Sequence, residues 1–188
     1  MNLQAKLLER FLRYVAVTSQ SNAAVKTVPT TSGQRELAEL LKTELAELGL
    51  VDLEISEFSV LTGKLPANLP AGHHAVPAVG WVAHLDTVDV CLNADIHPHV
   101  VKNYQGGDIC LNEEKQIFLK VSEHPEIEKY IGQDIVVSDG TSVLGADDKA
   151  AIANVMVALE TLANDKTIYH GDIYVCFVPD EEIGLLGA

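Results

Sequence analysis

The sequence predicts an α/β fold in which a mixed, largely parallel sheet is flanked by helices. Apolar, β-branched runs such as "AVGWVAHL" and "GDIYVCFV" alternate with segments whose apolar residues recur at helical spacing. This alternation of buried strands and amphipathic helices is typical of layered α/β domains. With 188 residues, 47% hydrophobic and 21% charged, the chain has the size and composition of one globular domain, and we identify no internal boundary.

Two helices are expected in the first 50 residues. Apolar residues recur at helical spacing over 3–15, which predicts an amphipathic helix packed on the domain. A second helix begins after Thr31 or Ser32, and Gln34 occupies the position of a capping-box partner of Thr31. Its leucine stripe ends at Gly49, which favours a helix C-terminus there.

The rest of the chain reads mainly as strands with one more helix. A half-exposed strand is expected in 50–58 and a second strand in 59–68. A buried strand beginning near residue 78 should end near Asp86. Residues 91–134 form a long irregular stretch with short strand candidates such as "QIFLKV". The remaining expected elements are a strand in 134–140, a helix in 145–165 and a final buried strand in 171–180.

Composition excludes several classes of partner. The formal net charge of -14 leaves no basic surface for nucleic acid, so none is expected as a partner. No stretch approaches the roughly 20 apolar residues of a membrane span, and charged residues interrupt the N-terminal segment where a signal peptide would be apolar. The three cysteines lack a CxxC spacing, which favours free thiols in a reducing compartment. We therefore expect a cytoplasmic protein.

Histidine and carboxylate residues gather at three predicted strand-to-turn junctions. In "AHLDT", His84 and Asp86 lie two residues apart, so their side chains project from one face of a strand. An imidazole that binds a metal commonly has its other nitrogen oriented by a carboxylate. Taken alone, this pattern more often marks a structural histidine with a capping aspartate.

The second junction is "LGADDKAA", where Asp147 and Asp148 lie at an expected helix N-terminus, a position that also suits a simple N-cap. The third is "PDEEIG". Glu181 and Glu182 would point to opposite faces of an ideal strand, so both can serve one site only if the strand has ended. Gly184 permits such a turn, although a solvated acidic turn has the same signature. Together, one imidazole and several carboxylates match the ligands of Zn²⁺, Mn²⁺ or Co²⁺, and the three junctions predict a metal site.

Three motifs carry a resemblance to a known family. "GWVAHLDTVD", "SDGTSVLGADDKAAIA" and "VPDEEIG" resemble three successive signatures of peptidase T, the tripeptide aminopeptidase. Peptidase T is one of the co-catalytic zinc metallopeptidases, which also include glutamate carboxypeptidases and acetylornithine deacetylase. Further similarity through "TSQSNAAVKTVPTTSGQRELAELLKTELAELGL" and "HPHVVKNYQGGDI" extends the resemblance over nearly the whole chain.

The resemblance implies a zinc-exopeptidase-like catalytic domain with two Zn²⁺ ions, for which Mn²⁺ or Co²⁺ can substitute. His84 would bind one zinc and Asp86 would orient it, whereas Asp147 would bridge both metals. Glu181 would be the general base and Glu182 a ligand of the second metal. The implied reaction is hydrolysis that releases the N-terminal residue of a tripeptide, and the implied full-length enzyme is a homodimer.

The family pattern continues beyond this chain. Residues 1–188 correspond to the N-terminal part of the catalytic domain, so we expect the inserted dimerisation domain and the C-terminal catalytic segment, with further aspartate and histidine ligands, to be absent. We expect the chain alone to hold only part of the active site. Two alternatives stay open, a related carboxypeptidase or deacylase and a non-catalytic metal-binding fragment. The remaining histidines considered as substitute ligands are expected to be exposed loop residues: His73, His74, His97 and His99.

Overall fold

The computed structural model describes residues 2–72, 74 and 76–188. It divides the chain into two compact units, one made of residues 1–89 with 145–188 and the other of residues 90–144. From the sequence we identify no boundary between these two units. Residues 90–144 are separate because they bury a small apolar cluster of their own, formed by Tyr104, Ile109 and Ile127.

The helices predicted from apolar spacing are present in the first unit. They are α1 (Leu3–Val15), α2 (Ser32–Glu47) and α3 (Ala146–Asn164). Helix α1 buries Phe11, Tyr14 and Val15, and it packs against α3. Gly49 follows α2 with a φ of +85°, the left-handed conformation that ends many helices. Helix α3 turns Ile152, Met156 and Leu159 fully into the core.

The sheet of this unit is mixed, as predicted. Its strands lie in the order β1 (Val51–Ile55), β2 (Leu61–Leu65), β8 (Ile173–Val178) and β3 (Val79–His84). The pairs β1–β2 and β2–β8 are antiparallel, and β3–β8 is parallel. The expectation of a largely parallel sheet is therefore corrected, because β1 and β2 form a hairpin instead of two strands joined by a helix.

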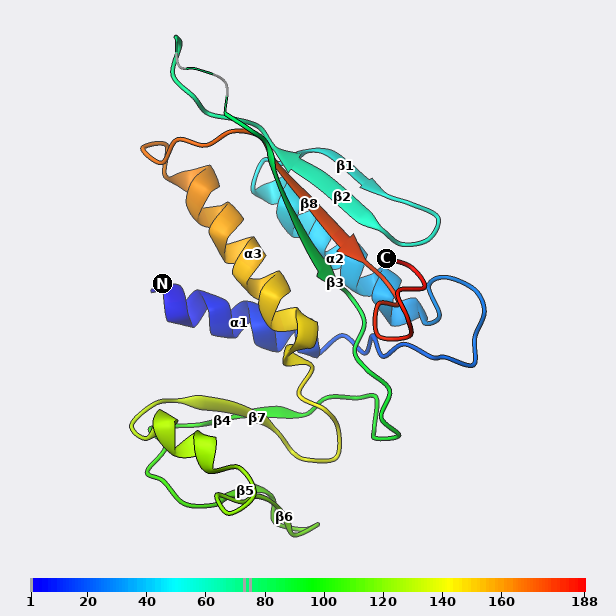
Figure 1. The fold of residues 1–188 in the computed structure, drawn as a ribbon, viewed down its shortest axis with the longest axis vertical. Coiled ribbons are helices and arrows are strands. Elements are labelled where there is room, and N and C mark those ends of the chain that lie inside the picture. The colour runs from blue at the N-terminus through cyan, green and yellow to red at the C-terminus, as the bar shows by residue number, and fades with distance from the viewer. Residues whose placement is uncertain (1, 73, 75) are drawn as a thin grey trace. The chain divides into compact units, whose positions relative to one another are not determined.

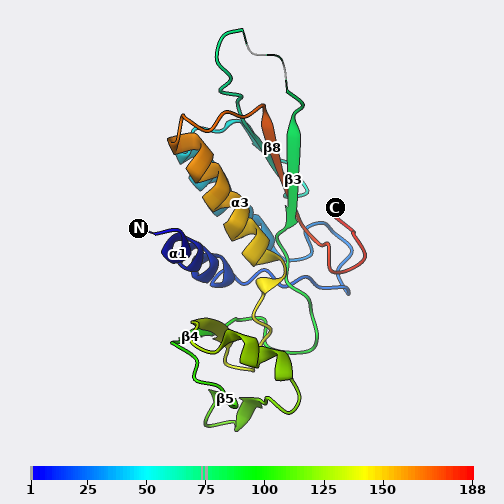
Figure 2. The same cartoon turned by 60° about the vertical axis from the view of Figure 1, so that its left-hand side comes forward.

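One face of this sheet is covered by helices and the other is exposed. Along β8, Ile173, Val175 and Phe177 are buried whereas Tyr174 is 48% exposed. Figure 1 shows α2 and α3 beside the strands, and Figure 2 shows that α1 and α3 lie on the same side of β3 and β8. Alternate side chains of β8 therefore form the core beneath the helices.

Strand β3 is less buried than its apolar sequence predicts. Val79 is 49% exposed and Val82 is 69% exposed. Strand β3 is an edge of the described sheet, and Val82 pairs with Cys176 on the uncovered face. Only its end, at Ala83 and His84, is buried. The strand ends at His84, two residues before the predicted end at Asp86.

The second unit contains the short strands expected within 91–134. Strand β4 (Pro98–Val101) pairs with β7 (Ile135–Ser138), and β5 (Ile109–Asn112) pairs with β6 (Ile117–Leu119), both antiparallel. A 3₁₀ helix, η1 (Pro125–Tyr130), contributes Ile127 to the cluster. Across the described residues of both units, no helix is long and apolar enough to cross a membrane. Cys110 and Cys176 are free thiols.

Candidate metal centre

The parallel pairing of β3 and β8 brings two of the predicted junctions together. Parallel strands end at the same edge of a sheet, and β3 ends at His84 where β8 ends at Val178. The backbone N–H of Leu85 then donates a 2.8 Å hydrogen bond to the carbonyl of Val178, so the two segments stay side by side just past the ends of β3 and β8. The segments after both strands therefore lie within reach of one another.

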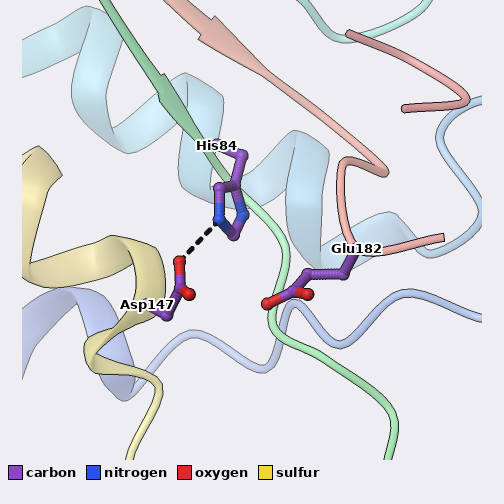
Figure 3. A group of neighbouring side chains, drawn as sticks. All are labelled: His84, Asp147 and Glu182. Atoms are coloured by element: carbon purple, nitrogen blue, oxygen red, sulfur yellow. Dashed lines mark hydrogen bonds and ion pairs between the residues drawn. The ribbon is translucent and has the colours of Figure 1, made fainter. Parts of the chain in front are cut away.

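Three side chains converge at this edge (Figure 3). His84, Asp147 and Glu182 each offer one ligand atom, and these atoms lie within 4.8 Å of one another. Nε2 of His84 is 2.9 Å from Oδ1 of Asp147. The structure thus places together the three residues that the sequence suggested as metal ligands. An imidazole nitrogen with two carboxylates is a donor set that fits zinc.

The His84 ring is held by Asp86. Its Nδ1 lies 3.0 Å from the backbone oxygen of Asp86 and 3.3 Å from Oδ1 of the same residue. A proton on Nδ1 is shared with these acceptors, which leaves Nε2 directed at Asp147. Burial lowers the pKa of His84, but the hydrogen bonds with Asp86 and Asp147 outweigh it and raise the pKa to about 9. In the metal-free chain, this imidazole is therefore the doubly protonated cation at neutral pH.

Asp86 also holds the turn that follows β8. Its fully buried carboxylate accepts the backbone N–H of Glu181 at 2.9 Å and that of Glu182 at 3.2 Å. Burial raises the pKa of Asp86, but the hydrogen bonds from His84, from these two amides and from Ser21 hold it below its usual value. Sequence reasoning gave Asp86 the orientation of His84 alone. The structure adds a connection between the histidine and the acidic turn.

The acidic turn places both glutamates outside the strand. Strand β8 ends at Val178, Asp180 has a φ of +53°, and Gly184 has a φ of +86°. The predicted turn after the strand, with Gly184 within it, is therefore present. Oε2 of Glu181 lies 4.0 Å from Nε2 of His84. Burial, Asp147 and Asp86 raise the pKa of Glu182, although His84 opposes the shift, which is expected where carboxylates crowd without a cation.

The aspartate pair turns towards β3. Asp147 and Asp148 both lie in the first turn of α3 with non-helical backbone angles. Oδ2 of Asp148 accepts the backbone N–H of His84 at 3.2 Å, while Asp147 meets the His84 ring. The interactions seen for both side chains thus favour the site over the N-cap interpretation. Burial raises the pKa of Asp148.

Sequence reasoning missed a buried cluster behind the turn. Gln34 was expected to complete a capping box with Thr31, but the cap makes no side-chain hydrogen bond to the backbone of α2. Gln34 is fully buried and its Nε2 donates to Oδ1 of Asp180 at 2.6 Å. The capping-box expectation is wrong because Oε1 of Gln34 accepts the backbone N–H of Asp180, 146 residues away, while Nε2 also donates to the Thr31 hydroxyl at 3.1 Å. A buried lysine was also missed: the Nζ of Lys149 donates to the carbonyl of Val17 at 2.9 Å.

The other histidines that the structure describes lie outside the cluster of three. His74 and His97 are exposed, as expected for loop residues. His99 differs from the expectation, because it is partly buried within β4. His73 lies outside the described residues.

Comparisons with known proteins agree with the motifs. The chain is 52% identical over 186 residues to a peptidase T-like protein of Yersinia pestis, and the alignment covers 99% of this chain and 44% of that protein. It is 47% identical over 178 residues to peptidase T of Photobacterium profundum, covering 95% of this chain and 42% of the relative. The chain thus spans less than half the length of these curated relatives. These matches confirm the resemblance to peptidase T, although no family model matches the chain.

A solved structure gives the same result for the fold. The crystal structure of aminopeptidase PepT from Bacillus cereus superposes with a TM-score of 0.64 at 27% sequence identity. The match covers 97% of this chain and 38% of that protein. The helix-flanked mixed sheet predicted from the sequence is therefore the arrangement found in part of a peptidase.

Proposed function

We propose that the chain forms the metal-binding part of the catalytic domain of a zinc aminopeptidase that removes the N-terminal residue of tripeptides. The observation that carries the proposal is the convergence of His84, Asp147 and Glu182 within 4.8 Å, with Glu181 beside them. Similarity to peptidase T along 95% of the chain supports the choice of reaction. The proposal extends to a cytoplasmic location and a full-length homodimer, without nucleic-acid or membrane partners.

The residues fit zinc by the chemistry of their donors. Nε2 of His84 and one oxygen each from Asp147 and Glu182 would hold the metal, and imidazole with carboxylates is a donor set found in catalytic zinc sites. Bound zinc lowers the pKa of water and polarises a carbonyl group. Mn²⁺ and Co²⁺ accept the same ligands.

The chain's own residues then supply orientation and proton transfer. Glu181 takes a proton from the attacking water as its oxygen bonds to the scissile carbonyl carbon. When the C–N bond breaks, Glu181 returns that proton to the departing amine, so one water is consumed and one new carboxyl end and one new amine end form. Asp86 keeps Glu181 in place through its backbone N–H and holds His84 through Nδ1.

A complete site would contain two metals. We propose that Asp147 would serve both of them and Glu182 the second, because the Asp147 side chain meets His84 and is still 82% exposed. The remaining ligands, the inserted dimerisation domain and the C-terminal catalytic segment would come from sequence outside residues 1–188. The chain's coverage of 44% of a relative supports this proposal.

The test is a Zn²⁺ titration of chelator-stripped protein by calorimetry, with release of amino acid measured on the same samples. We expect one zinc to bind the wild-type chain, and binding to be lost in His84→Ala but kept in His97→Ala, a matched histidine change in the second unit. Absence of zinc binding, or equal binding by both variants, would contradict the proposed metal site.

The peptide terminus that must be free distinguishes an aminopeptidase from a carboxypeptidase or a deacylase. In the full-length protein, an aminopeptidase should cleave a tripeptide with a free N-terminus and leave its N-acetylated form intact. Cleavage of the acetylated peptide would instead indicate a carboxypeptidase or deacylase. The exposure of Asp147 also favours a second function for the isolated chain, in which the chain binds metal without catalysis. Zinc binding without tripeptide cleavage by residues 1–188 would support that function.

A further inference from the structure

Asp180, the first of the three consecutive acids, has a different environment from the other two. It is fully buried, whereas Glu181 and Glu182 are partly exposed. The described ligand cluster uses Glu182 and leaves Asp180 out. A carboxylate buried in this way is costly unless it is fully hydrogen-bonded, so its partners indicate what it does.

The hydrogen bonds to the Asp180 carboxylate come from Thr30, two residues before α2 begins, and from Gln34 in its first turn. Oδ2 accepts the backbone N–H of Thr30 at 2.8 Å. Oδ1 accepts the Thr30 hydroxyl at 2.5 Å and Nε2 of Gln34 at 2.6 Å. In return, the backbone N–H of Asp180 donates to Oε1 of Gln34 at 2.9 Å. The Gln34 amide therefore binds both the side chain and the backbone of Asp180.

These bonds fix the backbone where the acidic turn begins. Asp180 adopts a φ of +53°, in the left-handed region that non-glycine residues rarely occupy. The next two backbone amides donate to Asp86. Thr30 and Gln34 thus hold the backbone at residue 180, and Asp86 holds the backbone of the next two residues. The Glu181 and Glu182 side chains project from this doubly fixed turn.

We infer that Asp180 is a positioning residue which, through Thr30 and Gln34, sets the direction of Glu181 and Glu182 at the metal centre. The inference rests on the proposed function for the roles of the two glutamates. Its structural part, that the Thr30–Gln34–Asp180 cluster fixes the turn, stands on the hydrogen bonds alone. Because Asp180 acts through the backbone, its loss should disturb the turn without removing a ligand.

The test uses a swap of the two polar groups. Asp180→Asn keeps one acceptor oxygen, so its NH2 group must face a donor, either the Thr30 N–H or Nε2 of Gln34. Gln34→Glu places a second carboxylate against Asp180. In the double variant, the new asparagine amide can donate to the new glutamate, and the backbone N–H of residue 180 keeps its acceptor. Tyr14→Phe is the matched control, because it removes a buried 2.8 Å hydrogen bond to Glu44 elsewhere in the same unit.

Two readouts separate positioning from general destabilisation. The first is amide hydrogen exchange by NMR in metal-free protein. We expect Glu181 and Glu182 to exchange at least about tenfold faster relative to α3 amides in either single variant. The second is the Kd for Zn²⁺, which should rise by about tenfold or more, as when outer partners of metal ligands are removed. The double variant should recover both, and Tyr14→Phe should change neither.

Uniform acceleration of exchange across the unit, or single variants with unchanged Kd, would overturn the inference. Failure of the double variant to recover the slow exchange of the turn would overturn it as well. If wild-type protein bound no zinc, the proposed function would fail. Selective exchange at the turn would still support the role of Asp180 in positioning it.

Discussion

Asp86→Asn tests the connection between His84 and the acidic turn. In the wild type, Oδ1 and Oδ2 of Asp86 each accept one backbone N–H, from Glu181 and Glu182. The asparagine keeps one oxygen, and its amide group must face the other N–H. The change leaves the side-chain volume almost the same, so packing effects are small and the hydrogen bonds dominate the result.

The expected magnitude follows from these contacts. A hydrogen bond to a charged group contributes about 1.5–3 kcal/mol, and a buried N–H without an acceptor costs about 1–3 kcal/mol. Losing one bond and weakening the other should lower the free energy of unfolding by about 3 kcal/mol. The pKa of Asp86 lies below its usual value despite burial, which shows that its hydrogen bonds outweigh its desolvation. The ionised Asp86 therefore stabilises the fold at pH values above its usual pKa. This contribution is lost as the pH falls through the lower pKa of the folded state.

Trp81 provides the assay. It is the single tryptophan of the chain and lies in β3, so its fluorescence in urea reports unfolding of the unit that contains the site. Asp165→Asn is the control, because Asp165 accepts two bonds from Thr167 beyond the end of α3. We expect Asp86→Asn to unfold at lower urea and to bind Zn²⁺ about 10–100-fold more weakly. An unchanged urea midpoint, or a Kd equal to that of the control, would refute the proposed role.

Three further changes have distinct expected outcomes. In the full-length enzyme, Glu181→Gln should lower kcat by about 10²–10⁴-fold with the Zn²⁺ affinity of the chain kept, and a loss of affinity instead would make Glu181 a ligand. Because the metal must displace a proton from His84, whose pKa is about 9, the apparent association constant for Zn²⁺ should rise about tenfold per pH unit from pH 6 to 8, and a flat calorimetric profile would contradict this. A Cβ at Gly33 would lie 1.7 Å from the carbonyl oxygen of Thr18, so Gly33→Ala should cost about 1–3 kcal/mol of unfolding free energy, whereas Gly80→Ala has open space. Equal urea midpoints for the two alanine variants would contradict the close approach.

Local patterns predicted much of this structure. The helices were evident because apolar residues at a spacing of 3.6 need only their own segment to be recognised. The acidic turn could also be predicted, since two consecutive glutamates cannot face one site within a strand and Gly184 allows the chain to turn. The exposure of Val82 could not be predicted in this way. It depends on β3 being an edge strand, and strand order depends on pairings between distant segments.

The same reasoning explains why the cluster behind the site escaped prediction. Thr30 and Gln34 stand in a sequence that resembles an ordinary helix start, and Asp180 appears as one more acid in an acidic run. Their meaning lies in contacts spanning 146–150 residues, which no local pattern records. An acidic side chain that its sequence neighbours suggest is exposed can thus be buried, as Asp180 is, when it holds a turn in place. The difference between Asp180 and its neighbours is therefore one of direction: its carboxylate points into the protein and anchors the turn, whereas the next two carboxylates lie close to His84.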